Sequence, residues 1–188
     1  FRRTAELADR IIAGNDFLAE HARQYCRDVH VLPTGLDTKG FHAKRNPADG
    51  KTRLVWIGSR STIRYLVELR EMLSRIGARY PNVVLRVIAD RFPEMEGISV
   101  EKCPWSLERE KQDLLECDIG LAPLPDNRFT RGKCSFKILQ YFAASLPCIA
   151  SPVGMNRDLV MPAENGFLAN TDEAVSYTHL RAHETKAN

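Results

Sequence analysis

The sequence lacks the features that mark several large classes of protein. No apolar run approaches the roughly 20 residues that a membrane-spanning helix needs. The five cysteines are odd in number and have no C-x-x-C or metal-like spacing, which indicates free thiols in a reducing compartment. The net charge of +3 is too small for a nucleic-acid surface, which needs a clustered basic patch. We therefore expect a cytoplasmic protein that binds no nucleic acid and holds any anion locally.

The chain also lacks an initial methionine, because it begins at Phe1 and runs directly into helix-like sequence. We expect the natural N-terminus to lie further upstream, so a signal peptide is neither indicated nor excluded. At the other end, "VSYTHLRAHETKAN" from Val175 has neither helical nor strand periodicity. It resembles translated sequencing-adapter read-through, and we expect residues 175–188 to be an artefactual or disordered tail.

A regular alternation of apolar runs and amphipathic stretches begins at Arg53. Runs such as "RLVWIG" and "NVVLRVIAD" alternate with helical spacings, for example at 61–80 and 106–118. This alternation predicts an α/β fold, a Rossmann-like parallel sheet with helices on both faces. Ligands of such sheets bind at the carboxyl ends of the strands. The loops to inspect therefore follow Gly58, Asp90, Leu124 and Pro152.

A polar stretch with glycine and proline divides the sequence into two parts. Residues 1–32 hold a strand-then-helix unit, with Asn15 or Asp16 as the expected helix cap, and a second short β run. Residues 33–52 have no apolar period and are typical of an interdomain linker. We therefore expect the end of one domain at 1–32 and most of another at 53–174.

The segment "IGSRSTIRY" is the first candidate anion site. Gly58 follows an apolar strand, and Ser61 or Thr62 is expected to cap the next helix. Backbone N–H groups and the positive end of the helix dipole favour an anion there. Arg60 and Arg64 add guanidinium groups suited to phosphate. A plain strand-to-helix turn with two solvated arginines is the alternative.

The segment "RGKCSFKILQYFAASLPCIASPVG", residues 131–154, is the second candidate. Arg131, Lys133 and Lys137 are expected at a helix N-terminus, where cations oppose the helix dipole by roughly 0.3–1 kcal/mol each. The i, i+4 spacing would set the two lysines on one helix face, so a bound anion would explain them. A solvated basic edge is the alternative. Cys134 has no partner base in the sequence, so a thiol nucleophile is not expected.

Several motifs together resemble one known family. "ADRIIAGNDFLAEHA", "HVLPTGLDTKGF", "LVWIGSRSTIRYL", "GKCSFKILQYFAASLPCIASPVG" and "ENGFLA" stand in the order found in glycosyltransferase family four, the group 1 glycosyltransferases of GT-B architecture. The resemblance covers residues 5–170 and implies two Rossmann-like domains facing across a cleft. It makes residues 1–32 the end of the acceptor-side N-terminal domain and 53–174 most of the domain that binds the nucleotide-diphosphate sugar.

The resemblance also assigns roles to individual residues. Gly58 corresponds to the glycine after the first strand of the donor domain, and Arg64 to the family's diphosphate-binding lysine. Ser59 replaces the family's arginine, and Arg60 stands one place further on as a substitute. The expected donor diphosphate-binding residues are therefore Gly58, Arg60, Arg64, Lys133 and Lys137.

The sugar and ribose positions depart from the family pattern. The Glu-x7-Glu motif falls on Gly132 and Gln140, so both carboxylates are absent. Gln140 keeps an amide that can hydrogen-bond the ribose hydroxyls, and Gly154 matches the glycine of the loop after the next strand. The expected ribose- and sugar-binding residues are thus Gln140 and Gly154, and no catalytic residue is assigned.

The implied activity is transfer of a hexosyl-type sugar from a nucleotide-diphosphate donor to a glycan or lipid-linked acceptor, with retained anomeric configuration. The resemblance implies no metal and no further cofactor, and His21, His30 and His42 have no ligand spacing between them. Electrostatic stabilisation of the departing diphosphate would be the main catalytic effect. Polysaccharide biosynthesis and association with a membrane surface would fit such an acceptor. The acceptor-facing side chains would lie upstream, so we expect this chain alone to be inactive.

Two other functions remain open. A non-catalytic nucleotide- or partner-binding module of GT-B type is the main alternative, because Gly132 and Gln140 replace the two carboxylates. A GT-B epimerase or phosphorylase is less favoured, because the cofactor lysine motif of the phosphorylases is not found.

Overall fold

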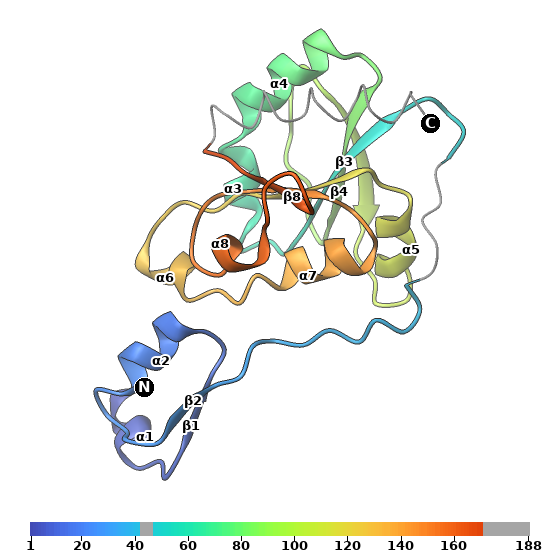
Figure 1. Cartoon of the computed structure of the whole chain (residues 1–188). Coiled ribbons are helices and arrows are strands. Elements are labelled where there is room, and N and C mark those ends of the chain that lie inside the picture. Colours follow the sequence, from blue (N-terminus) through green and yellow to red (C-terminus); the bar gives the residue numbers. More distant parts are fainter. Residues whose placement is uncertain (42–46, 171–188) are drawn as a thin grey trace.

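The computed structural model describes residues 1–41 and 47–170, so the expected tail at 175–188 and the centre of the expected linker lie outside the described residues. A small N-terminal unit, blue in Figure 1, is joined by a long connection to a larger α/β unit. The small unit contains α1 (Arg2–Glu6), β1 (Ile11–Ala13), α2 (Asp16–Ala22) and β2 (Val29–Val31). Its two strands pair in parallel.

The cap of α2 is the one that the sequence predicts. Asn15 has extended backbone angles, and its side-chain Oδ1 accepts a hydrogen bond from the backbone N–H of Leu18 at 2.9 Å. An asparagine in this position satisfies one of the free N–H groups at the helix start. The strand-then-helix prediction for this unit is therefore confirmed.

The larger unit is built on one six-stranded parallel sheet. Its strands are β3 (Thr52–Ile57), β4 (Val83–Ala89), β5 (Ser99–Pro104), β6 (Ile119–Ala122), β7 (Cys148–Ala150) and β8 (Gly166–Leu168). They lie in the order β5-β4-β3-β6-β7-β8 and pair in parallel throughout. The order reverses between β3 and β6, which is the arrangement of a Rossmann-like sheet. The predicted fold class is confirmed.

Helices cover both faces of the sheet and divide the apolar core in two (Figure 1). They are α3 (Ile63–Val67), α4 (Arg70–Arg79), α5 (Glu110–Leu115), α6 (Arg128–Arg131), α7 (Phe136–Ala143) and α8 (Asn156–Leu159). On one face Trp56 of β3 packs in a cluster with Leu73 of α4. On the other, Val55 packs in a cluster with Ile138 and Tyr141 of α7. Alternate residues of β3 thus enter opposite cores, as the period of a strand requires.

Tyr141 fixes α7 closely against the sheet. A Cβ at Gly120 of β6 would lie 2.3 Å from Cδ2 of Tyr141, so only glycine fits there. The buried Tyr141 hydroxyl donates to the carbonyl oxygen of Leu121 at 2.9 Å and accepts from the N–H of Ile57 at 3.3 Å. These contacts tie the helix to β3 and β6, so the first turn of α7 is held beside the ends of both strands.

The helix expected at 61–80 is two helices in the structure. The N–H of Leu69 bonds the carbonyl oxygen of Leu66, three residues back, at 3.0 Å. This tighter turn ends α3 at Val67, and α4 begins at Arg70. The single-helix prediction was wrong because the sequence carries no glycine or proline to mark the break.

Two expected helix starts differ in detail from the structure. Thr62 is the N-cap residue of α3, as one of the two expected caps, but its Oγ1 donates to the carbonyl oxygen of Ser59 at 3.1 Å and accepts no hydrogen bond from the helix. The helix expected from Ser106 begins only at Glu110, after a turn in which the Ser106 carbonyl accepts from the N–H groups of Arg109 and Glu110. Within residues 1–41 and 47–170, no helix is long and apolar enough to cross a lipid bilayer.

Candidate functional site

A cavity of about 680 Å³ lies at the carboxyl ends of the strands. The segments after four strands contribute to its lining, with Ser59 after β3, Asp90 after β4, Trp105 after β5 and Leu124 after β6. The first turns of α7 and the loop before it form the opposite wall. Because the sheet order reverses between β3 and β6, the cavity occupies the position where ligands of such sheets bind.

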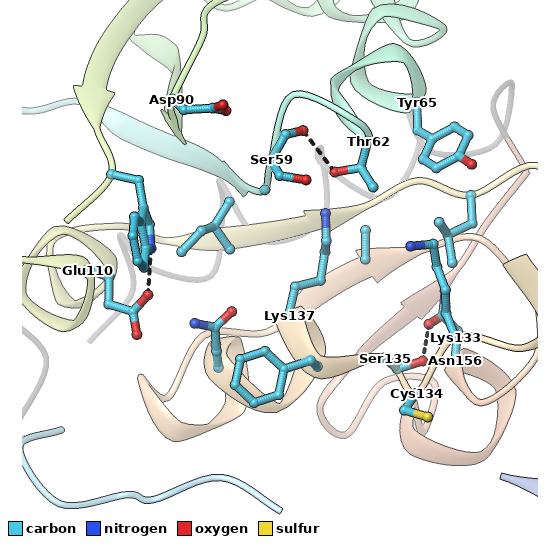
Figure 2. A pocket seen from close by; sticks show the side chains of 17 residues that line it. Ser59, Thr62, Tyr65, Asp90, Glu110, Lys133, Cys134, Ser135, Lys137 and Asn156 are labelled. Carbon is cyan, nitrogen blue, oxygen red and sulfur yellow. Dashed lines mark hydrogen bonds between the residues drawn. The ribbon is translucent and has the colours of Figure 1, made fainter. Parts of the chain in front are cut away.

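Lys137 is the central cation of this cavity. It is the second residue of α7, and Figure 2 shows its side chain extending toward Ser59 and Thr62. Its Nζ lies 4.4 Å from the centre of the fully buried Trp56 ring, a cation–π contact. Burial, together with the nearby charge of Lys133, lowers the pKa of Lys137 to about 7. Within the part of the chain that the structure describes, no carboxylate pairs with this ammonium group.

Lys133 lines the same cavity, but it does not lie on a helix with Lys137. Because α7 begins at Phe136, Lys133 belongs to the preceding loop, and the prediction of a shared helix face was wrong. Ser135 turns the chain into α7 with a left-handed φ of 51°, and its Oγ donates to Oδ1 of Asn156 at 2.7 Å. Lys133 Nζ lies 4.9 Å from the Phe129 ring centre. The loop therefore brings together two lysines that the sequence places four residues apart.

Arg131 has a different position from the expected one. It is the last residue of α6 rather than the start of a helix, and a cation there is favoured by the helix dipole. Its guanidinium forms an ion pair with Asp126, at 2.5 Å from Nε to Oδ1. This pairing leaves Lys133 and Lys137 as the cations that line the cavity.

Gly58 lets the chain pass close to the buried ring of Trp56. A Cβ at position 58 would lie 2.5 Å from Cη2 of Trp56 and 3.0 Å from Oγ1 of Thr62. A side chain would therefore clash on both sides, and the cavity lining here is bare backbone. An anion can approach backbone most closely where no side chain intervenes.

The other end of the cavity carries polar groups that were not among the expected site residues. Trp105, 49% exposed, donates its indole N–H to Oε2 of Glu110 at 2.7 Å. Asp90 accepts the backbone N–H of Arg60 at 2.9 Å through Oδ1. In Figure 2 Glu110 lies at the far side of the cavity from Lys133. Asp90 and Trp105 each directly follow a strand, and this position is the signal by which the sequence could have indicated them.

The two positions without the family's carboxylates differ in environment. Gln140 is only 5% exposed and lines the cavity one turn after Lys137. Gly132 faces α2 instead: a Cβ there would lie 3.2 Å from Cδ2 of Leu18. A glutamate at position 132 would thus press on the N-terminal unit, whereas Gln140 places an amide in the cavity.

Three expected site residues lie outside the cavity lining. The Arg64 guanidinium donates to the hydroxyl of Tyr65 at 3.1 Å and stacks on that ring. Arg60 has an exposed side chain and contributes its backbone N–H to Asp90. Gly154 has a φ of 52°, and a Cβ there would lie 2.9 Å from the carbonyl oxygen of Arg131. The structure thus brings together Gly58, Lys133, Lys137 and Gln140, and the roles of the other three stay predictions.

Among residues 1–41 and 47–170, no group of three or more His, Cys, Asp or Glu side chains is placed to hold a metal ion. The positive charge available to a ligand in the cavity therefore comes from Lys133 and Lys137.

Comparison with protein families gives one match that covers most of the chain. The family described as "Glycosyl transferases group 1" matches residues 51–181. A comparison with curated proteins found no significant match. The matched range contains every cavity-lining residue described above.

Solved structures share the fold at low sequence identity. Sucrose-phosphate synthase from Thermosynechococcus elongatus superposes with a TM-score of 0.73 at 17% identity, over 99% of this chain and 52% of its own. Anabaena HepE, solved with UDP and glucose, gives 0.71 at 15%, over 98% and 57%. The pneumococcal O-GlcNAc transferase GtfA, in complex with UDP and GlcNAc, gives 0.63 at 13%, over 97% and 40%. The chain thus spans about half the length of such proteins, or less.

Proposed function

Because the chain belongs to the group 1 glycosyl transferase family, we propose that its cavity binds the nucleotide-diphosphate sugar of a retaining hexosyltransferase. The observation that carries this proposal is Lys137, an ammonium group held over a buried ring with a second lysine nearby and, among the described residues, no carboxylate partner. A partly buried charge without a counterion is costly, and an anion removes that cost. A diphosphate supplies enough negative charge for both lysines.

The proposed chemistry is electrostatic. As the bond between the sugar and the diphosphate breaks, negative charge develops on the diphosphate, and Lys133 and Lys137 neutralise it in a partly desolvated cavity. Bare backbone at Gly58 leaves room for phosphate oxygens beside the end of β3. The two ammonium groups provide the charge that a metal ion would otherwise provide, so we propose transfer without a metal or a further cofactor.

The nucleoside end of the donor is assigned to the side of Trp105 and Glu110. Gln140, which lines the cavity one turn of α7 after Lys137, is assigned to hydrogen-bond the ribose hydroxyls through its amide. HepE and GtfA were solved with UDP, which makes uridine nucleotides the first donors to test. The acceptor is proposed to be a glycan or lipid-linked hydroxyl in the cytoplasm, at a membrane surface in the lipid-linked case, by analogy of family alone.

The test of donor binding is calorimetric titration of the chain with UDP, UMP, GDP and ADP. Diphosphates are expected to bind more tightly than UMP, because the second phosphate contacts the lysine pair. Lys133→Glu should weaken UDP binding by about tenfold or more, since a charge-assisted hydrogen bond is worth roughly 1.5–3 kcal/mol. Arg75→Glu makes the same change of charge at an exposed position of α4, and it should leave the UDP affinity unchanged. Equal UDP affinities for wild type and Lys133→Glu would remove the lysines from the proposal.

A non-catalytic nucleotide-binding module is the second candidate, and one observation favours it. Gln140 puts a neutral amide in the cavity where family members carry a carboxylate. The two functions are separated by release of free sugar or transfer from UDP-, GDP- and ADP-sugars, measured on the full-length protein that contains this chain. Tight UDP binding without turnover of any donor would favour the module.

A further inference from the structure

The loop that carries Lys133 is held by a residue of the N-terminal unit. We name residues 131–135 the cation loop. Asn15, at the start of α2, is only 4% exposed. Its side-chain Nδ2 donates to the carbonyl oxygen of Arg131 at 3.3 Å and to that of Lys133 at 3.2 Å. One amide thus bridges more than a hundred residues of sequence to hold the backbone on either side of Gly132.

The other end of the cation loop is held from within the larger unit. Ser135 donates through Oγ to Oδ1 of Asn156, which is 1% exposed, and Nδ2 of Asn156 donates to the carbonyl oxygen of Ser151 at 2.9 Å. Two buried asparagines therefore fix the loop from opposite ends. Only one of them, Asn15, belongs to the unit that precedes the linker.

Close packing accompanies the Asn15 hydrogen bonds. A Cβ at Gly14 would lie 2.4 Å from Sγ of Cys134, so the two segments touch, and a side chain at position 14 would require this Sγ to turn aside. On the next helical turn, Leu18 lies against Gly132, where a Cβ would be 3.2 Å from its Cδ2. The N-terminal unit thus meets the cation loop through glycines on both sides of the contact.

Capping of α2 does not account for the Asn15 amide. Its Oδ1 already satisfies the helix by accepting from Leu18, and serine or aspartate would do this equally well. Among the residues that the structure describes, Nδ2 donates only to carbonyl oxygens of the cation loop. The amide is therefore needed for the contact between the two units and not for the helix.

We propose that Asn15 is a positioning residue: by holding the carbonyls of Arg131 and Lys133, it sets the cation loop so that Lys133 reaches the donor diphosphate. The inference rests on the proposed donor site. It means that docking of the N-terminal unit and binding of the diphosphate favour each other, because a coupling between two sites is reciprocal. The acceptor-side unit thereby contributes to donor affinity without touching the donor.

Asn15→Ser is the direct test, because serine keeps the cap of α2 and is neutral but lacks the amide. We expect UDP affinity to fall by about tenfold, within the usual range of coupling between sites. UMP and uridine affinities should fall much less, since Lys133 acts on the diphosphate. Asn165→Ser removes an amide that also bridges two backbone groups, from Met161 and Leu159, away from the cavity, and should leave all three affinities unchanged.

An engineered disulfide supplies the rescue experiment. A Cβ at position 14 would lie 3.8 Å from Cβ of Cys134, which is the separation typical of a disulfide. Gly14→Cys, oxidised against Cys134 with oxidised glutathione, should bind UDP as the wild type does. In the Asn15→Ser background the oxidised protein should recover UDP affinity to within about twofold, and dithiothreitol should abolish the recovery.

The outcomes separate this inference from the proposed function. Wild type that binds no nucleoside diphosphate overturns the donor site and the inference together. Wild type that binds UDP, with Asn15→Ser binding it equally and showing the same circular dichroism, overturns the positioning role alone. If Asn15→Ser does not fold, Asn15→Asp, which also retains the cap, replaces it. A defect in Asn15→Asp that the oxidised disulfide does not repair contradicts the proposal.

Discussion

The Lys137 side chain has opposite effects on folding stability and on anion binding. Its ammonium lies over Trp56, with no carboxylate partner in residues 1–41 and 47–170, which disfavours the charged form in the empty cavity. We therefore expect Lys137→Met to raise the free energy of unfolding at neutral pH by about 1 kcal/mol, because an apolar side chain replaces a partly desolvated charge. The same change should weaken UDP binding by at least about tenfold. Urea denaturation and calorimetry measure the two effects, and lower stability with unchanged UDP affinity would contradict this account.

The pKa of Lys137 also predicts a pH dependence of stability. Its value in the folded protein, about 7, lies below the ordinary 10.5, so between these values the unfolded chain binds more protons than the folded one. The free energy of unfolding should therefore rise with pH over this window for wild type relative to Lys137→Met. The other charged residues of the cavity, Lys133, Asp90 and Glu110, are the same in both proteins. Parallel pH profiles for the two would show that Lys137 titrates normally.

Binding of a diphosphate should reverse this effect on Lys137. The anion favours the ammonium form, so at about pH 8 UDP binding should take up a proton from solution. Titrations in buffers of different ionisation enthalpy measure this uptake. Lys137→Asn, which removes the titrating amine and keeps a polar side chain, should show none. Equal uptake by both proteins would assign the proton to another group.

Individual residues of the site could be predicted only where the backbone between them is regular. Gly58, expected after an apolar strand, and Gln140, expected from the family motif, both line the cavity, and their roles stay predictions. Arg60 lies in the turn that precedes α3, where the N–H of Thr62 bonds the carbonyl oxygen of Ser59, and Arg64 lies just after this turn; neither side chain lines the cavity. Side-chain direction after an irregular turn follows tertiary contacts, which a sequence pattern does not contain.

At the scale of elements, three neighbouring strands are joined by a buried charge cluster below the cavity. Glu101 of β5 accepts hydrogen bonds from Arg53 of β3 and Arg86 of β4, each at 3.0 Å. Burial alone would raise the pKa of Glu101, but the hydrogen bonds from Arg53 and Arg86 outweigh it and leave the pKa lowered. Each arginine has a second carboxylate partner, Asp49 for Arg53 and Glu116 for Arg86.

Glu101→Gln is therefore expected to lower the free energy of unfolding by about 1–3 kcal/mol at pH 7, less than for a fully buried pair because Glu101 is partly exposed. A lowered pKa gives stability that is present above the ordinary pKa of 4.5 and is lost as the pH falls through the folded value. Wild type should consequently lose more stability than Glu101→Gln on acidification. Glu96→Gln, at an exposed position, is the matched control. An equal loss of stability in wild type and in Glu101→Gln would contradict a stabilising role for the cluster.

The elements themselves divide into those that the sequence indicates and those that it does not. Strands β3 to β7 and helix α7 follow from apolar runs and helical spacing, whereas β8 was not predicted as a strand. The start of α7 does not, because the left-handed turn at Ser135 is stabilised by Asn156, twenty-one residues later in sequence. The cation loop is likewise fixed by Asn15, far earlier in sequence. Contacts over such separations decide where a helix starts, and no local pattern encodes them.

At the scale of the molecule, the two units differ sharply in the size of their apolar cores. The larger unit encloses two apolar clusters around its sheet. The small unit has two three-residue strands, and its buried apolar residues are few: Ala5, Ala13, Ala19, Ala22 and Cys26. A unit of this size buries too little surface to be stable alone. Within the described residues, the contact with the cation loop adds buried surface to this small core.

This difference predicts the pattern of amide hydrogen exchange. Amides of α2 should exchange much faster than those of β3 and β4, because local opening of the small unit costs less than opening of the sheet. If docking and diphosphate binding favour each other, saturating UDP should slow exchange in α2, although none of its residues lines the cavity. Mass spectrometry of deuterium uptake measures both effects.

The same measurement on Asn15→Ser separates coupling from a general stabilisation by ligand. In that variant UDP should still slow exchange at the end of β3 and the start of α7, which line the cavity, but should no longer slow it in α2. A ligand that merely stabilises the whole fold would slow α2 equally in both proteins. Equal protection of α2 in wild type and Asn15→Ser would therefore show that the N-terminal unit responds to the donor by some route other than the Asn15 amide.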